Sequence, residues 1–297
     1  MPAWEGVISS LITPLKDGGN SIDPEAMREY CDFIVEKGVH GIFALGTTGE
    51  GLLLSLSERE SIAETVVAHV NNRVPVIIQT GCITTGQTIE LTKHCRDIGA
   101  DAACMVLPYY YILDDEAIFT YFKRIADAVP GFPLFIYNIP QYTGNDLNPI
   151  LFERLIDNIE TIVGLKTSNR DMFQLQDYIR VAKDRCSVFI GCDHLILAAL
   201  FLGASGIVSG NASAFPEAFI RLYQAFERGE LEKARECQVF GHKLENVLAD
   251  GPSIALFKKA LDFRGMKVGS VREPNRGLSP DETAKLSTSL RELGLIQ

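Results

Sequence analysis

A lone lysine, Lys166, ends a short apolar run of strand character, TIVGLK at residues 161–166. Because residues i, i+2 and i+4 of a strand share one face, Ile162, Gly164 and Lys166 are expected to point the same way. If that face is an interior, desolvation lowers the pKa of the lysine toward neutrality. An unprotonated amine can attack a ketone and form a Schiff base. The alternative is an ordinary lysine that leaves the strand for solvent.

A second group of polar residues lies in the segment GTTGEG at residues 46–51. Thr47 and Thr48 stand between glycines, so backbone N–H groups and hydroxyls can together bind a carboxylate or a phosphate. The alternative here is a plain polar turn.

Phenols form a third group. Residues 109–111 are three consecutive tyrosines, and buried phenols need hydrogen-bond partners. Tyr137 follows Phe135 by two residues in another apolar run, so it faces an interior if Phe135 does. A phenol beside an iminium can shuttle protons. Packing against a neighbouring subunit would also explain the three tyrosines.

These groups must be positioned by the elements around them, and short apolar runs alternate with amphipathic segments along the chain. Seven helical segments are expected between eight strands. The first helix is expected over residues 23–37, with Pro24 in its first turn and Gly38 after its end. Ser57 and Glu60 predict a capping box, and Asp114 or Asp115, Asp171 and Asp193 are candidate N-caps. The strands are expected at residues 7–12, 41–45, 74–79, 102–107, 134–137, 161–166, 187–191 and 206–208.

Eight strand–helix alternations in about 210 residues predict a (β/α)8 TIM barrel, whose functional residues lie on the loops after the strands. A doubly wound sheet would more often carry a glycine-rich phosphate loop after its first strand, where this chain has LITP. After Pro216 the strand signals cease, and helices are expected over residues 217–228, 231–249, 253–263 and 281–293. We therefore predict a catalytic barrel domain at residues 1–214 and a C-terminal helical domain at residues 215–297, with residues 264–280 as a linker-like loop.

Composition limits the partners. The 297 residues carry a net charge of −10, which argues against nucleic acid or an anionic membrane as a standing partner. No apolar run approaches the ~18 residues of a membrane span, and the first residues do not resemble a signal peptide, so a cytoplasmic protein is expected. Seven scattered cysteines without a C-x-x-C pair indicate reduced thiols. The five histidines form no metal-binding motif, and no metal is expected.

Taken together, these segments resemble the family of dihydrodipicolinate synthase and N-acetylneuraminate lyase. Its members are Schiff-base (class I) aldolases and lyases on a (β/α)8 barrel with a C-terminal helical region. The common order and spacing of the motifs carry the resemblance over nearly the whole chain. The motifs are TP at 13–14, GTTGE at 46–50, PYY at 108–110, YNIP at 137–140, GLK at 164–166, GIVS at 206–209 and GSVREP at 269–274.

The resemblance implies that Lys166 forms an imine with pyruvate or another 2-keto acid, and that Tyr137 is the principal acid/base group. Thr47 and Thr48 would bind the pyruvate carboxylate and link the tyrosines in a hydrogen-bonded relay. Tyr110 would complete that relay across a tight dimer interface, and two such dimers are expected to form a homotetramer.

The resemblance also implies that the backbones of Gly191 and Val208 line the active site. The substrates would be pyruvate or a 2-keto acid and an aldehyde. No cofactor is needed, because the protonated imine supplies the electrophile. A metal-dependent aldolase would need a cluster of histidines or carboxylates on these loops.

One position departs from the family pattern. In dihydrodipicolinate synthases an arginine two residues beyond the Tyr-Asn-x-Pro proline holds the carboxylate of the second substrate, and here that position is Tyr142. A guanidinium binds a carboxylate bidentately, whereas a phenol offers one donor. Ser168 and Asn169, just after the lysine, and Thr143, beside Tyr142, suit the hydroxyls of a sugar-derived acid, although Ser168 and Asn169 could equally start the next helix. Arg170 could still supply the missing charge.

The favoured interpretation is therefore an aldolase for a 2-keto-3-deoxy sugar acid, with weak or no use of aspartate semialdehyde. The alternatives within the family are 4-hydroxy-tetrahydrodipicolinate (dihydrodipicolinate) synthase and a keto-deoxy acid dehydratase. An alternative of another class is a non-enzymatic metabolite-binding barrel. The retained lysine, tyrosines and threonines argue against that alternative, although fold alone could not exclude it.

Overall fold

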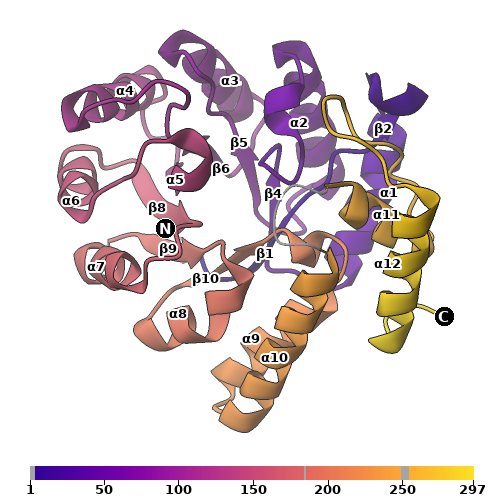
Figure 1. The fold of residues 1–297 in the computed structure, drawn as a ribbon. Helices are drawn as coiled ribbons and strands as arrows, with labels where there is room; N and C mark the ends of the chain where they lie inside the picture. Colours follow the sequence, from indigo (N-terminus) through magenta and orange to yellow (C-terminus); the bar gives the residue numbers. More distant parts are fainter. Residues whose placement is uncertain (1–3, 184, 249–253) are drawn as a thin grey trace.

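The computed structural model describes residues 4–183, 185–248 and 254–297, and its centre is a closed barrel of eight parallel strands (Figure 1). The strands follow one another around the barrel in chain order, and β1 closes it by pairing with both β4 and β10. The predicted TIM barrel is confirmed, and each strand lies within two residues of its expected bounds. The strands are β1 (Gly6–Ser10), β4 (Gly41–Ala44), β5 (Val76–Gln79), β6 (Ala102–Val106), β7 (Leu134–Asn138), β8 (Ile162–Thr167), β9 (Ser187–Ile190) and β10 (Gly206–Ser209).

Helices surround the barrel and continue beyond it. Two short pieces were not expected from the sequence: an antiparallel hairpin of β2 (Leu15–Lys16) and β3 (Ser21–Ile22), and a single-turn helix, α5 (Pro140–Thr143). The helices between strands are α1 (Pro24–Glu36), α2 (Leu56–Val70), α3 (Thr85–Asp97), α4 (Asp115–Ala128), α6 (Pro149–Asn158), α7 (Met172–Ala182) and α8 (Ile196–Leu202). The C-terminal helices are α9 (Pro216–Glu227), α10 (Leu231–Leu248), α11 (Ile254–Phe263) and α12 (Pro280–Glu292).

Two of the predicted caps are confirmed, Asp114 and Asp171, and two are not. Asp23, Asp114 and Asp171 each accept hydrogen bonds from backbone N–H groups in the first turn of α1, α4 and α7. The capping box of α2 is formed by Ser55 and Glu58 rather than by the predicted Ser57 and Glu60, because the helix begins two residues earlier, at Leu56. Two of the C-terminal bounds predicted from sequence, at residues 249 and 253, lie outside the described residues.

Asp193 was a candidate N-cap, and this prediction was wrong. It lies inside a short 3-10 helix (Asp193–Leu195), and its carboxylate accepts hydrogen bonds from the side chains of Ser209 and Asn211 instead.

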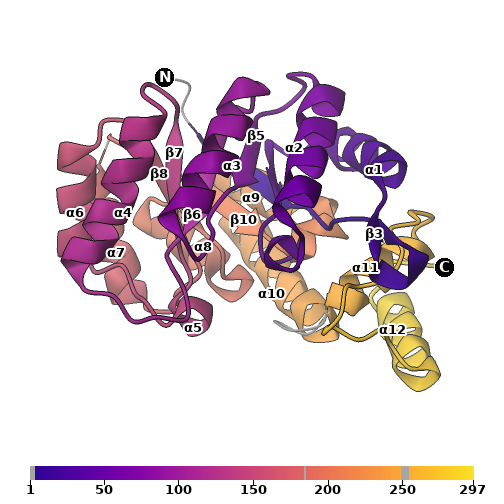
Figure 2. The ribbon, with the colours of Figure 1, turned by 90° about the horizontal axis from the view of Figure 1, so that it is seen from above.

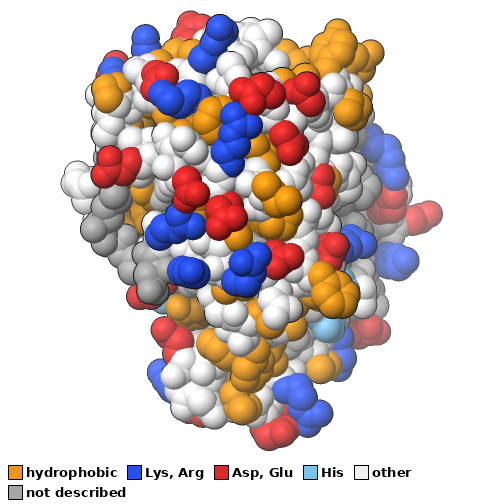
Figure 3. All heavy atoms as spheres, turned by 90° about the vertical axis from the view of Figure 1, so that its left-hand side faces the viewer, with side chains coloured by type: hydrophobic (Ala, Val, Ile, Leu, Met, Phe, Trp, Pro, Cys, Tyr) orange, Lys and Arg blue, Asp and Glu red, His pale blue; other side chains and the backbone are white. Residues whose placement is uncertain are grey.

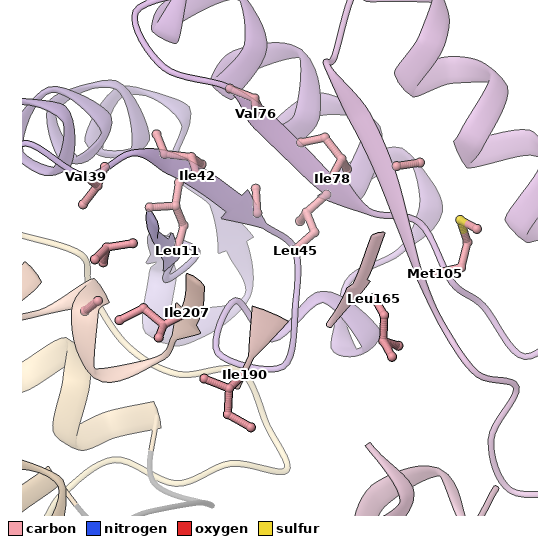
Figure 4. Packing of buried hydrophobic residues seen from close by; sticks show 14 of the residues in the cluster. Leu11, Val39, Ile42, Leu45, Val76, Ile78, Met105, Leu165, Ile190 and Ile207 are labelled. Atoms are coloured by element: carbon pink, nitrogen blue, oxygen red, sulfur yellow. The ribbon is translucent and has the colours of Figure 1, made fainter. Parts of the chain in front are cut away.

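The core has two apolar layers. Alternation along each strand sends one set of side chains outward, where they pack between the barrel and the helices, and the other set into the barrel. Phe43, Cys104, Phe135, Tyr137 and Phe189 belong to the inner cluster. Figure 4 shows part of the outer layer, including Leu11, Ile42, Ile78, Leu165, Ile190 and Ile207.

A β-bulge changes the alternation in β8. Leu134 of β7 pairs with Ile162, but the next residue, Phe135, pairs with Gly164, so Val163 is an extra residue on the β8 side. The expectation that Ile162 shares a face with Gly164 and Lys166 was therefore wrong at its first member. Ile162 packs in the outer layer, and Val163 packs inside.

The segment at residues 264–280 is not a free linker. Val268 and Val271 are buried, Gly269 bridges to Leu15, and Ser270 donates its backbone N–H to Leu15 O. In both views α11 lies near the β2–β3 hairpin, and α12 packs against α10 and α11 (Figures 1 and 2). The division into residues 1–214 and 215–297 stays a prediction. None of the described helices combines the length and apolar character that crossing a bilayer requires.

Candidate active site

The carboxyl ends of the strands surround a cavity of about 120 Å³. All the site residues expected from the sequence line it, with the exception of Tyr110. They come from the ends of five strands, β4, β7, β8, β9 and β10, which is where barrel enzymes carry their functional groups. The expected residues in the lining are Thr47, Thr48, Tyr137, Tyr142, Lys166, Ser168, Gly191 and Val208.

Lys166 is buried, with 5% of its surface exposed, which excludes a lysine that leaves the strand for solvent. It is paired with Tyr137 across β7 and β8. Its Nζ lies 3.9 Å from the centroid of the Tyr137 ring and 4.4 Å from that of Phe43. Burial raises the pKa of the neighbouring Cys104 thiol to about 12, against the opposing effect of the Lys166 charge. The amine therefore projects from an apolar barrel interior into the cavity.

Tyr137 and Thr47 approach each other across this cavity. The tyrosine ring is buried and meets Phe43 edge-on, which fixes its orientation. Its hydroxyl lies 3.4 Å from Thr47 Oγ1, longer than a usual hydroxyl–hydroxyl bond, and either group can donate. A phenol, an amine and a hydroxyl are thus within reach of one small molecule.

The loop that carries Thr47 and Thr48 is tightly fitted to the barrel. A Cβ on Gly51 would lie 1.9 Å from Leu45 O, so only glycine allows this approach. Thr13 Oγ1 donates to Gly49 O at 2.6 Å. Because the backbone is held in this way, the Thr47 side chain stays exposed and that of Thr48 half-exposed at the edge of the cavity.

Gly191 lies where a side chain would collide with the site. A Cβ there would be 2.4 Å from Ser168 Oγ and 3.1 Å from Lys166 Cε. The absence of a side chain thus leaves the space into which the lysine extends. Val208 belongs to the apolar cluster inside the barrel.

The cavity lining also holds charged and polar groups that sequence reasoning missed or weighed only as a risk. Arg170 lines it together with two acids, Asp193 and Glu245. Gln141 also lines it and donates through Nε2 to Ser168 O at 3.0 Å. Glu245 projects from α10 and pairs with His194 Nδ1, which carries a charge only when protonated. Ile254 and Phe257 of α11 complete the wall.

Two residues expected near the second substrate point elsewhere. Thr143 is buried, and its hydroxyl bonds Ile139 O and Asn145 O. Asn169 donates through Nδ2 to Gln174 Oε1 at 2.6 Å. The polar groups after β7 and β8 are therefore only partly directed at the cavity.

Tyr110 lies outside the cavity lining of its own chain. It is 80% exposed, its φ of 78° is in the left-handed region, and its ring meets that of Tyr111 edge-on at 5.0 Å. Any role for this phenol at a catalytic site requires a second copy of the chain. Among the described residues, no three His, Cys, Asp or Glu side chains gather in a way that could hold a metal ion.

Comparisons with known proteins agree with this geometry. The model of the dihydrodipicolinate synthetase family matches residues 3–293. The 4-hydroxy-tetrahydrodipicolinate synthase of Methanopyrus kandleri is 36% identical over 292 residues, which cover 98% of this chain and 97% of that protein.

Two solved structures are similar over nearly their whole length. YagE, a prophage protein of the dihydrodipicolinic acid synthase family from E. coli K12, was solved in complex with pyruvate. It is 30% identical, with a TM-score of 0.93 over 98% of this chain and 99% of that one. A sialic acid aldolase of Ruminococcus gnavus, in a catalytic lysine mutant, is 27% identical, with a TM-score of 0.94 over 98% and 96%.

Proposed function

The chain belongs to the dihydrodipicolinate synthetase family, and from this we propose that it is a Schiff-base lyase acting on pyruvate and an aldehyde through Lys166. The observation that carries the proposal is the buried Lys166 amine, paired with Tyr137 and open to a small cavity at the carboxyl ends of the strands. A non-enzymatic binding barrel would need neither an imine-forming lysine nor a phenol beside it.

The chemistry begins with attack of Lys166 Nζ on the C2 carbonyl of pyruvate. Loss of water, with the Tyr137 hydroxyl protonating the departing oxygen, gives an iminium. The Tyr137 phenolate then takes a proton from C3, and the positive nitrogen accepts the electron pair left behind. The resulting enamine attacks the aldehyde carbon, and the aldehyde oxygen takes a proton from the Tyr137 hydroxyl. Water hydrolyses the new iminium and frees the lysine. Cleavage runs through the same steps in reverse.

Thr47 and Thr48 are proposed to hold the pyruvate carboxylate. Their hydroxyls lie at the edge of the cavity, beside backbone N–H groups of a tightly held loop, and a carboxylate accepts hydrogen bonds from both. Anchoring the carboxylate there would present C2 to the lysine. Hydroxyl contact between Thr47 and Tyr137 offers a path for protons within the site.

We propose that the aldehyde is hydroxylated and that the product is a 2-keto-3-deoxy sugar acid. Tyr142 stands where a synthase would carry its arginine, and a phenol holds a carboxylate less well. Asp193 and Glu245 also line the cavity, and a carboxylate accepts hydrogen bonds from hydroxyl groups. A second carboxylate placed between these acids would be repelled.

One observation favours the synthase as a second candidate. Arg170 lines the cavity and could meet the carboxylate of aspartate semialdehyde from the loop after β8 rather than from the loop after β7. The Methanopyrus kandleri relative bears the synthase name over almost its full length.

A homotetramer built from tight dimers is also proposed. Tyr110, Tyr111 and Ile112 are 80%, 65% and 75% exposed in one short segment, which suits a self-complementary contact. On the face formed by α4, α6 and α7, separate apolar side chains are scattered among charged ones (Figure 3). There Ile150 of α6 and Phe173 of α7 are 79% and 84% exposed. A cytoplasmic location stays an expectation from the sequence.

Borohydride reduction in the presence of pyruvate tests the proposed chemistry. Mass spectrometry should find the reduced adduct on Lys166, and the Lys166→Met variant should give none. An adduct on another lysine, or no adduct with any 2-keto acid, would refute the proposed mechanism.

Side-by-side assays with glyceraldehyde and aspartate semialdehyde decide between the two candidates. We expect clear reaction with glyceraldehyde, and Tyr142→Arg should shift preference toward the semialdehyde. Efficient use of the semialdehyde by the unmodified protein, lost in Arg170→Ala but not in Arg180→Ala on the surface of α7, would establish the synthase instead.

A further inference from the structure

The loop that carries Thr47 and Thr48 is flanked by two residues with an unfavourable backbone conformation. Leu45 before it and Glu50 after it both have left-handed backbones, with φ of 62° and 54°. Each such conformation is unfavourable for a residue with a Cβ, and it persists only where the surrounding structure fixes it. The loop therefore depends on contacts made outside its own sequence.

Glu50 provides those contacts, and it makes them with the C-terminal region. Its side chain is 1% exposed, and Oε2 lies 2.7 Å from Lys258 Nζ on α11. Oε1 accepts hydrogen bonds from Arg272 N at 2.8 Å and from Asn275 Nδ2 at 3.1 Å. Both carboxylate oxygens are thus engaged by residues more than 200 positions further along the chain.

Lys258, the ion-pair partner of Glu50, is also buried. Its side chain is 3% exposed, and Nζ also donates to Ser270 O at 2.6 Å. Burial lowers the pKa of Lys258, and the charge of Glu50 opposes this effect. Each charge is therefore poorly tolerated without the other.

The contacts continue from Arg272 back to the barrel. Its guanidinium donates to Gly19 O and Asn20 O at 2.9 Å and forms an ion pair with Glu58 at 2.7 Å. Glu58 belongs to the capping box of α2, the helix that follows the threonine loop. The residue whose N–H binds Glu50 is thus itself held by the turn at Gly19 and Asn20 and by α2.

The helix that carries Lys258 also forms the cavity wall. Phe257, the preceding residue, lines the cavity. A Cβ on Gly210 would lie 3.0 Å from Thr48 Oγ1 and 3.9 Å from Phe257 Cζ, so the threonine and the phenylalanine flank the same glycine. A displacement of α11 would therefore reach the threonine loop both through Glu50 and through this wall.

We propose that Glu50 is a positioning residue for the keto-acid carboxylate, because its contact with Lys258 and the Arg272 segment holds Thr47 and Thr48 in their binding conformation. The C-terminal region then contributes to pyruvate binding, because it fixes the loop that binds the carboxylate. This inference rests on the proposed function only for the identity of the ligand that the loop holds. An ordinary buried ion pair would affect folding stability and leave the loop unchanged.

Four variants separate the two explanations. Glu50→Gln keeps an acceptor for Arg272 N but leaves the Lys258 charge unpaired, and Lys258→Met leaves the Glu50 charge unpaired. The double variant removes both charges. The matched control is Leu286→Ala, which creates a cavity under α12 in the same C-terminal region without touching the loop.

The first readout is the pyruvate concentration that half-saturates borohydride trapping at Lys166. We expect it to rise about 10-fold in each single charge variant and by no more than this in the double variant, because all three lack the same contact. Leu286→Ala should lower the unfolding midpoint and leave this concentration unchanged. A folded Glu50→Gln protein with wild-type pyruvate dependence would overturn the proposal.

The second readout needs no ligand. Amide hydrogen exchange is measured in the peptide covering residues 46–54, with each variant held the same number of degrees below its own thermal midpoint. Exchange should be at least about 10-fold faster in Glu50→Gln than in Leu286→Ala. Equal rates would overturn the proposal. If Glu50→Gln does not fold, Asn275→Ala takes its place, because it removes one hydrogen bond to Glu50 Oε1 and leaves both charges intact. The proposal then requires a smaller increase in the exchange rate of the same peptide. Failure of the wild type to trap any 2-keto acid would refute the proposed function, while the exchange experiment would still decide the role of Glu50.

Discussion

Replacing Gly191 by alanine should damage imine formation without unfolding the protein. The added Cβ would lie 2.4 Å from Ser168 Oγ and 3.1 Å from Lys166 Cε, whereas ordinary van der Waals contact begins near 3.4 Å. The serine hydroxyl must therefore move by about 1 Å and the lysine methylene by a few tenths of an ångström. A misplacement of about 1 Å at a reacting group can reduce a rate ~10²-fold. We expect the rate constant of borohydride trapping with pyruvate to fall roughly 10- to 100-fold.

A rescue variant separates the two collisions. Ser168→Ala combined with Gly191→Ala removes the closer collision and leaves the contact with the lysine. Trapping should recover to within about 5-fold of the wild-type rate if the serine transmits most of the displacement. Gly86→Ala in α3 is the control, because its Cβ would meet no atom within 4 Å and should leave trapping unchanged. A folded Gly191→Ala protein that traps pyruvate at the wild-type rate would refute the packing argument.

Three further outcomes are expected. Tyr137→Phe should lower turnover ~10²–10⁴-fold while borohydride still traps pyruvate, because only the proton path is lost; turnover within about 3-fold of wild type would exclude this phenol as the shuttle. Tyr110→Glu should sediment as a monomer and should have low turnover in a separate assay. A fully active monomer would contradict the shared interface. The hydrogen bond from Arg272 lowers the pKa of Glu58, so its stabilising effect is present above 4.5 and lost as the pH falls. Glu58→Gln should therefore cost about 1 kcal/mol near pH 7, and thermal unfolding should show this difference closing in acid.

The barrel was predictable because local signals and the global fold agree. Each strand is a short apolar run, most helices begin at a residue that can cap them, and parallel strands joined by helices favour closure into a barrel. The expectation for Lys166 was correct even though Ile162 was misplaced. The bulge at Val163 alters the alternation before Gly164, and the two-residue period from Gly164 to Lys166 is unaffected.

The site was predictable only where it follows strand ends. Tyr137 and Lys166 were expected to meet because consecutive parallel strands are neighbours, and the register pairs them. Glu245 and Phe257 line the same cavity, yet they belong to helices whose approach depends on long-range packing. No spacing in the sequence relates Glu50 to Lys258, so a buried ion pair between them could be found only in the structure.

The loss of an arginine at position 142 does not remove positive charge from the cavity, because Arg170 reaches the same lining from the loop after β8. Arg170 was the residue that, from the sequence alone, could still supply this charge. In a barrel, adjacent loops converge on one mouth, so a function lost from one loop can be supplied by its neighbour. On the proposed function, selection of the second substrate would depend on the balance between Arg170 and the acids Asp193 and Glu245. These three side chains come from different elements, so under the proposed mechanism that balance could change without any change in Lys166, Tyr137 or the threonine loop.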